Sequence, residues 1–236
     1  TRPLALAQTP GGAVFWGEYF DNPRREAVHV YGSIDGGRSW PVVYTFAPGE
    51  IRHVHSVTYD PYGACLWVLT GDEGAECRVL RAAVDWTTVD VVLAGHQQAR
   101  AVSLVARPDA LYFATDTPDE QNFIYRLERS GRLARLAPVA SSSICSCAVG
   151  SALFFSTAVE PSDVNRGVHA MLYGSLDGEA WAPCVRWKRD RWPAKFFQYA
   201  NIVLPAGEND GSVLAATGVG VLGEDGVTHL WKVPSE

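Results

Sequence analysis

The sequence reads Ser-Ile-Asp-Gly-Gly-Arg-Ser-Trp at residues 33–40, between two runs rich in β-branched and aromatic residues at 28–31 and 42–46. An aspartate in such a stretch can accept hydrogen bonds from the amides of its own turn, and glycine supplies positive φ. A tryptophan at the end can pack the turn onto the sheet behind it. The stretch therefore predicts a tight hairpin turn between two strands.

Shorter copies of this stretch recur along the chain. Residues 175–181 read Ser-Leu-Asp-Gly-Glu-Ala-Trp, and Trp181 lies 141 positions after Trp40, which is three steps of 47. Trp86, in Val84-Asp85-Trp86, lies 46 positions after Trp40 and indicates a decayed copy. A chain of 236 residues holds five such units. Since fixed periods of this size are typical of repeat architectures, the repeat determines the predicted fold class.

The units predict an all-β fold, specifically a β-propeller of five blades with four antiparallel strands each. Helical periodicity is almost absent, and short strand-like runs alternate with Gly, Pro, Asp and Asn. We expect one domain over 1–236, with blades at about 4–47, 51–94, 97–139, 142–188 and 196–233. The last blade is predicted to be one strand short. Because the chain opens at Thr1, almost directly on an inner strand, a six-bladed ring is the alternative if upstream residues are missing.

The pattern Ser-x-Asp-x-Gly-x-Ser/Thr-Trp at 33–40 resembles the Asp-box, or BNR repeat, of sialidase-like β-propellers. The resemblance implies that each box is a structural turn on the outer rim of a blade and not a catalytic element. It covers only the boxes and the repeat plan. The arginine triad of sialidases has candidates in Arg52 and Arg100 but no clear third member, and no Phe/Tyr-Arg-Ile-Pro motif precedes the first box. Boxes also occur in lyases, carbohydrate-binding proteins and assembly factors, so they do not specify an activity.

Composition limits the partners. A net charge of −6 and a pI near 5.5 argue against a nucleic-acid surface or an anionic membrane face, and no apolar run reaches the length of a membrane span. Five cysteines without framework spacing favour buried thiols and a cytoplasmic location, while secretion stays open because the N-terminus does not begin with Met. We expect Cys145 and Cys147 to be core residues. Trp187 and Trp192, in the basic run 186–192, are expected to pack between blades, and stacking on a sugar ring is the alternative. The oligomeric state is left open.

Blade geometry predicts where the chemistry lies. The first strands begin and the second strands end on one face, around the central channel, and the boxes lie on the opposite face. Four acids recur where second strands end, and two carboxylates in different environments are what glycoside hydrolysis requires. The predicted catalytic candidates are Asp116, Glu160, Glu18 and Asp72. Asp116 and Glu160 are the first choices, because a nearby proline stiffens each loop.

Other polar side chains on this face are expected to bind the substrate: His53, His55, Gln98, Arg100, Tyr19, Gln198 and Asn201. His53 and His55 share one face of a strand. They are read either as a hydrogen-bonded pair or as two ligands of a divalent metal, with His96 as a third. No cofactor is expected otherwise.

Three functions follow from these residues. The first is a carbohydrate- or glycoconjugate-active enzyme resembling a glycoside hydrolase, acting on a carbohydrate or small-molecule substrate. The second is a non-catalytic propeller that binds a glycan or a protein. The third is a metal-dependent lyase or hydrolase built on His53 and His55. The sequence leaves open whether the protein is an enzyme.

Overall fold

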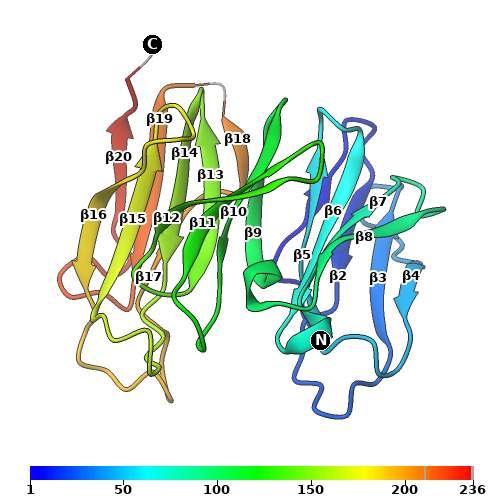
Figure 1. The fold of residues 1–236 in the computed structure, drawn as a ribbon, viewed down its shortest axis with the longest axis horizontal. Helices are drawn as coiled ribbons and strands as arrows, with labels where there is room; N and C mark the ends of the chain where they lie inside the picture. Colours follow the sequence, from blue (N-terminus) through cyan, green and yellow to red (C-terminus); the bar gives the residue numbers. More distant parts are fainter. Residues whose placement is uncertain (210, 235–236) are drawn as a thin grey trace. The chain divides into compact units, whose positions relative to one another are not determined.

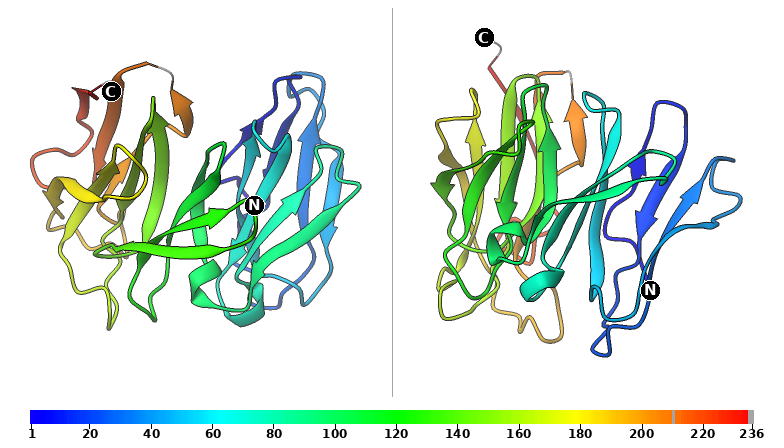
Figure 2. Two further views of the ribbon diagram at one scale, coloured as in Figure 1. Left: turned by 45° about the horizontal axis from the view of Figure 1, so that its top comes forward. Right: turned by 45° about the vertical axis from the view of Figure 1, so that its right-hand side comes forward.

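A computed structural model describes residues 1–209 and 211–234. Over these residues the chain forms five β-sheets and two single-turn 3₁₀ helices. Figure 1 labels most of the strands. Figure 2 shows the strands of each sheet twisted relative to one another. The chain divides into two compact units, which are described separately. The first comprises residues 1–102 and 106–108, and the second comprises 103–105 and the described residues from Asp109 onward.

The first unit contains two four-stranded antiparallel sheets, each with its strands in chain order. The first sheet consists of β1 (Ala7–Gln8), β2 (Val14–Gly17), β3 (Val28–Ser33) and β4 (Val42–Phe46). The second consists of β5 (His53–Asp60), β6 (Cys65–Gly71), β7 (Arg78–Ala82) and β8 (Val89–Ala94). The 3₁₀ turns η1 (Gly74–Glu76) and η2 (Gln97–Ala99) follow β6 and β8. Val30, Phe46 and Leu66 belong to one core cluster shared by the two sheets.

The remaining strands form three sheets. The third sheet consists of β9 (Ala101–Ala106), β10 (Ala110–Thr115), β11 (Phe123–Glu128) and β12 (Leu133–Pro138). The next contains β13 (Ser143–Val149), β14 (Ala152–Thr157), β15 (His169–Ser175) and β16 (Ala182–Lys188). The last contains β17 (Asn201–Val203), β19 (Val213–Val219) and β20 (Thr228–Lys232), so it is one strand short, as predicted.

One strand departs from the prediction. β18 (Gly207–Asn209) leaves the last sheet and pairs in parallel with β13, from Cys147↔Gly207 to Val149↔Asn209. Its three residues are exposed, so no apolar pattern marks it as a strand. The fourth sheet therefore has five strands.

Burial is greatest in the second strand of three of the sheets. Every residue of β6, β10 and β14 is buried, whereas the outer strand β16 is mostly exposed. Strands with both faces covered read as continuous apolar runs, which is why these three were recognisable in the sequence. Each ends in a loop that carries one of the predicted acids.

The turns at 33–40 and 175–181 have the hydrogen bonds that their residues predict. Asp35 Oδ1 accepts from the amides of Arg38 (2.9 Å) and Ser39 (3.0 Å), and Trp40 Nε1 donates to the carbonyl of Gly37 (3.1 Å). In the second copy, Asp177 Oδ1 accepts from the amides of Glu179 and Ala180. The predicted turn chemistry is confirmed.

The basic run differs from the expectation in one residue. Trp187 lies near His229 (5.1 Å between ring centroids) and Trp231 (6.4 Å), but the side chain of Trp192 is 63% exposed. The expectation that both tryptophans pack is therefore wrong for Trp192, because the chain leaves the sheet at Lys188.

All five cysteines are free thiols. Cys147 is buried, and Cys145 packs against the same core cluster.

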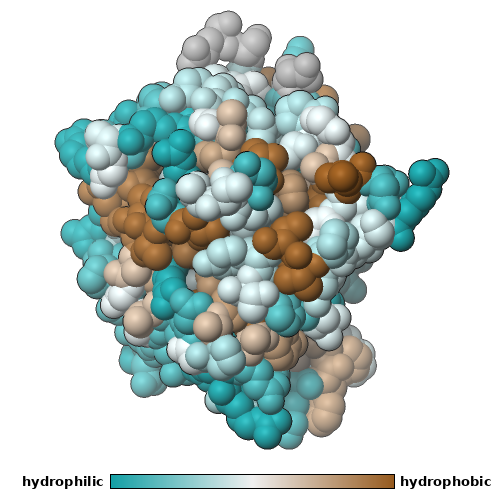
Figure 3. Space-filling view, turned by 90° about the vertical axis from the view of Figure 1, so that its right-hand side faces the viewer, coloured by the Kyte–Doolittle hydropathy of each residue, from teal (hydrophilic) through white to brown (hydrophobic). Residues whose placement is uncertain are grey.

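No helix among the described residues is long and apolar enough to span a membrane. In the view of Figure 3, hydrophobic residues form separate patches among hydrophilic ones.

Candidate functional site

The candidate site lies where β5 begins and β6 ends, within the first unit. His53 pairs with Gly71, so the antiparallel register places Asp72, the residue after β6, beside the start of β5. A register shift between Val54 and Ser56 turns His55 toward the same point. Gly71 has to be glycine here, because a Cβ atom would lie 2.5 Å from Cε1 of His55.

Ligand-type atoms of three side chains converge at this point. His53 Nε2 lies 3.1 Å from His55 Nε2, which lies 3.1 Å from Asp72 Oδ1. His53 Nε2 is also 3.4 Å from Asp72 Oδ2. Both imidazoles are buried, whereas the Asp72 side chain is 15% exposed. Among the described residues these three form the group of side chains able to hold a metal ion.

The outer ring nitrogens show which tautomer each imidazole adopts. Nδ1 of His53 lies 3.1 Å from the carbonyl oxygen of Phe20, and Nδ1 of His55 lies 2.8 Å from that of Ala101. A carbonyl oxygen can only accept, so each Nδ1 carries the hydrogen. In a neutral imidazole Nε2 then presents a lone pair. Two lone pairs and a carboxylate facing one another within 3.1–3.4 Å require a cation or a proton between them.

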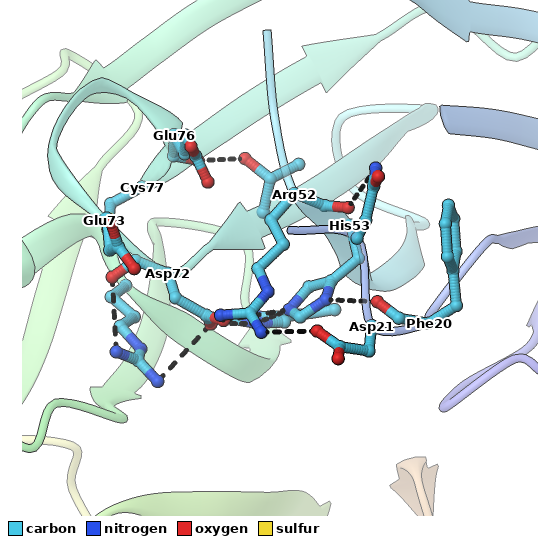
Figure 4. A network of polar contacts seen from close by, with 12 residues as sticks. Phe20, Asp21, Arg52, His53, Asp72, Glu73, Glu76 and Cys77 are labelled. Carbon is cyan, nitrogen blue, oxygen red and sulfur yellow. Dashed lines mark hydrogen bonds and ion pairs between the residues drawn. The ribbon is translucent and has the colours of Figure 1, made fainter. Parts of the chain in front are cut away.

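Two arginines surround the carboxylate, as Figure 4 shows for Arg52. Arg52 lies 3.4 Å from Asp72 Oδ2 and 2.7 Å from Asp21 Oδ1, and Arg100 Nη2 lies 3.4 Å from Asp72 Oδ1. Burial raises the pKa of Asp72, but hydrogen bonds from His53 and His55, in which a proton on Nε2 occupies the place of a cation, and the charge of Arg100 outweigh it and hold the pKa well below its usual range. Asp72 is therefore ionised at neutral pH, which suits a ligand and not a proton donor.

Neighbouring groups hold the loop that carries Asp72. Gln97 Nε2 and Arg100 Nη1 both donate to the main-chain carbonyl of Asp72, at 3.1 and 3.2 Å. The ring of Tyr19 lies 4.3 Å from that of His53. The structure thus brings together five predicted site residues: His53, His55, Asp72, Arg100 and Tyr19. The predicted site set did not include Arg52, Gln97 and Asp21. Arg52 directly precedes His53 in the sequence, and this position was the signal that could have placed it in the site.

The other predicted residues of this region lie differently. His96 and Gln98 are exposed, and His96 lies outside the three-residue group, where Asp72 takes the third place. Glu18 is buried. Its Oε2 accepts from the amide of His29 (2.8 Å) and its Oε1 from the hydroxyl of Tyr31 (3.3 Å). These contacts within its own sheet favour a structural role for Glu18.

The first-choice acids belong to the second unit. Asp116 is buried directly after β10, and Glu160 is half-buried after β14. The pairing of these two carboxylates stays a prediction. In the same unit Gln198 is exposed, and Asn201 begins β17 and accepts from the amide of Ile202 (2.7 Å).

Buried asparagines position these loops, and the sequence interpretation missed them. Asn122 accepts from the amide of Thr117 (2.9 Å) and donates to its carbonyl (2.8 Å), and Asn165 Nδ2 donates to that same carbonyl (3.0 Å). Asn22 holds the corresponding loop of the first unit, because its Nδ2 donates to the carbonyls of Glu26 and Arg52, both at 3.0 Å. Each asparagine lies in the loop between the second and third strands of its sheet.

Comparison with known proteins identifies the fold. No family model and no curated protein matches the sequence. A prolyl endopeptidase structure aligns with a TM-score of 0.53 at 12% identity, covering 98% of this chain and 36% of that one. TolB from Acinetobacter baumannii aligns at 0.53 with 14% identity, covering 95% and 54%. A protein described as a gluconolactonase aligns at 0.50 with 15% identity, covering 99% and 93%. These neighbours are β-propeller proteins.

The fold is a β-propeller. The chain spans only about a third of the endopeptidase and about half of TolB, and at these identities the likeness shows the fold alone. The likeness to Asp-box propellers in particular stays a prediction.

Proposed function

We propose that this propeller holds a divalent metal ion on His53, His55 and Asp72 and is a metal-dependent hydrolase or lyase. The observation that carries the proposal is the convergence of two imidazole lone pairs and an ionised carboxylate. Their separations of 3.1, 3.1 and 3.4 Å match the spacing of neighbouring ligand atoms around a transition metal, about 3.0–3.4 Å for bonds near 2.1 Å.

The surroundings support a metal rather than a plain hydrogen-bonded pair. Metal-binding histidines usually donate their other ring N–H to a carbonyl or carboxylate, which fixes the tautomer. Both imidazoles have such a carbonyl partner. Two histidines and one carboxylate suit Zn²⁺, Fe²⁺, Co²⁺, Ni²⁺ or Mn²⁺ better than Mg²⁺ or Ca²⁺, which prefer oxygen.

Three protein ligands would leave coordination positions for water and substrate. A bound metal would supply a Lewis acid and a more acidic water. The residues supply the rest: Arg52 and Arg100 form ion pairs that orient Asp72, and Gln97 donates to its main-chain carbonyl. Arg52, whose side chain is 28% exposed, would contact a substrate oxygen. A carbohydrate or sugar-derived substrate is proposed because one propeller neighbour is described as a gluconolactonase.

Metal titration tests the proposal. Protein treated with a chelator is titrated with Zn²⁺, Co²⁺ and Mn²⁺ by calorimetry, and untreated protein is measured by elemental analysis. We expect one equivalent to bind, and His55→Ala to weaken binding at least about 100-fold. His169→Ala is the matched control, because His169 contacts Arg186 in the other unit and should leave binding unchanged. Folded protein without metal above background and without binding heat would refute the centre.

A second candidate function is glycoside hydrolysis by Asp116 and Glu160. It is favoured by the burial of Asp116 in a loop fixed by Asn122 and Asn165. Asp116→Asn and Glu160→Gln variants that stay folded and turn over an identified glycoside at the wild-type rate would exclude it. A glycan array that shows binding without turnover would favour the non-catalytic alternative.

The same proposal takes residues 1–236 as one propeller domain whose five sheets are its blades. The three-stranded last sheet supports this reading, since it matches the repeat plan. An experimental structure of the full chain tests the blade count.

A further inference from the structure

The connection between β16 and β17 is long and exposed. It runs over residues 189–200, and all of these residues are exposed except Asp190, Ala194 and Ala200. A loop of this length without regular structure is uncommon in a compact domain and usually has a function. Two backbone hydrogen bonds hold its start. The amide of Arg189 donates to the carbonyl of Val168 (2.9 Å), and the amide of Asp190 donates to the carbonyl of Gly220 (2.9 Å).

This 189–200 loop presents four aromatic side chains to solvent. Their exposed fractions are 63% for Trp192, 73% for Phe196, 58% for Phe197 and 49% for Tyr199. The ring centroids of Trp192 and Phe197 lie 5.3 Å apart, so these two rings contact each other, and Phe196 and Tyr199 lie in the same short segment. Contiguous exposed apolar surface of this kind marks an interaction site.

Cations accompany the aromatics. Arg189, Arg191 and Lys195 are exposed, as is Lys188 at the end of β16, and Lys195 Nζ lies 5.8 Å above the ring of Phe196. The one carboxylate, Asp190, accepts from the amide of Trp192 (2.9 Å). The loop is thus locally basic in a chain whose net charge is −6.

We infer that the 189–200 loop docks on an anionic lipid surface. Trp, Tyr and Phe favour the boundary between headgroups and acyl chains, and nearby Lys and Arg are attracted to anionic headgroups. The net charge argued against a membrane partner, but attraction depends on the charges within a Debye length of the surface, about 8–10 Å. Single-stranded nucleic acid also stacks on aromatic rings, but its sites combine them with a basic groove along the strand. Here the basic charge is confined to one loop.

Vesicle co-sedimentation of the full chain tests the inference. The probes are vesicles of phosphatidylcholine alone and vesicles with about one third phosphatidylserine. We expect binding only to the anionic vesicles, and weaker binding at high salt. The double variant Phe196→Ala/Phe197→Ala should lower the partition coefficient by at least about tenfold. Arg191→Gln/Lys195→Gln should also lower it about tenfold or more.

Ile34→Ala is the matched control, because Ile34 is an apolar residue 89% exposed in a turn of the other unit. It should leave the partition coefficient unchanged. Absence of binding to anionic vesicles at low salt would overturn the inference, as would an equal loss in Ile34→Ala. Tighter binding to a single-stranded oligonucleotide, lost in the same loop variants, would assign the loop to nucleic acid instead. Metal binding by the loop variants is expected to be unaltered, so this test is independent of the proposed metal centre.

Discussion

At the scale of single residues, Asp60 shows how one buried carboxylate organises a turn. It is fully buried at the end of β5, and its Oδ1 accepts from the amides of Tyr62 and Gly63, both at 3.0 Å. Its Oδ2 accepts from Trp67 Nε1 at 2.9 Å. Removing the carboxylate would leave the buried Nε1–H of Trp67 and two part-buried amides without this acceptor.

Asp60→Ala is therefore expected to lower the free energy of unfolding by roughly 3–5 kcal/mol, since each buried donor left unsatisfied costs about 1–3 kcal/mol. Urea unfolding measures the change. Asp90→Ala, at an exposed position of β8, is the control and should change stability by less than about 0.5 kcal/mol. Similar urea-unfolding midpoints for Asp60→Ala and Asp90→Ala would contradict the role assigned to Asp60.

The thiols give a second prediction at this scale. Burial, aided by the neighbouring Cys145, raises the pKa of Cys147 to about 12, whereas Cys184 is exposed. Only about one Cys147 thiol in 10⁴ is ionised at pH 8, so Cys147 should resist a thiol reagent in the native protein. We expect Cys184 to react first with Ellman's reagent and Cys184→Ser to remove this first phase. A fast phase that survives in Cys184→Ser would contradict the assignment.

The candidate site was predictable in part. His53, His55 and Asp72 could each be named, because strand starts and ends are visible in the sequence. Their mutual distances could not be predicted, since these depend on the register of β5 against β6 and on the irregularity after Val54. That is why His96, nearby in the repeat plan, was considered as the third ligand in place of Asp72.

At the scale of elements, the turns at 33–40 and 175–181 are held by their own carboxylates. Hydrogen bonds from the side chain and amide of Ser39, and then from Ser33, hold the pKa of Asp35 well below its usual range. The pKa of Asp177 is lowered as well, by hydrogen bonds from the amides of Ala180 and Glu179. The turn that contains Trp86 has a different conformation. Trp86 itself adopts a positive φ of 60°, and its ring centroid lies 5.8 Å from those of both Phe15 and Tyr44.

A lowered pKa in the folded state means that ionised Asp35 stabilises the fold. This contribution is fully present above the ordinary pKa near 4 and is lost as the pH falls below it. Asp35→Ala should therefore lower the melting temperature at pH 7, and the difference from the wild type should shrink toward pH 3. Thermal unfolding at both pH values measures this, with Ile34→Ala in the same turn as the control. A difference that is independent of pH would show that the charge is not the cause.

At the scale of the whole molecule, most of the fold was predictable because Gly- and Asp-rich turns punctuate every hairpin. The predicted runs at 28–31 and 42–46 lie within β3 and β4, and the short last sheet was expected. β18 could not be predicted, since its Gly-Glu-Asn sequence has no apolar alternation and its partner β13 lies almost 60 residues away. Pairing between segments so far apart leaves no local signal.

The fourth and fifth sheets are expected to unfold together. One core cluster contains Phe154 and Leu172 from the fourth sheet and Ile202 and Leu214 from the fifth. Ile202→Ala, at a fully buried position, should cost about 2–5 kcal/mol and increase hydrogen exchange in β13 and β14 as well as in β19. The 78–82 strand, in the other unit, serves as the internal reference. Faster exchange confined to β17, β19 and β20 would show that the last sheet opens alone.

The parallel pairing of β18 with β13 also bears on how the chain tolerates being cut. A protease specific for Lys and Arg should cleave the exposed 189–200 loop at Arg191 or Lys195, between the fourth sheet and the last. Because β18 is hydrogen-bonded into the fourth sheet and the core cluster spans both sheets, the nicked halves should stay associated and separate only in denaturant. The loop is thus a natural split point, at which the protein could be expressed as two fragments that reassemble.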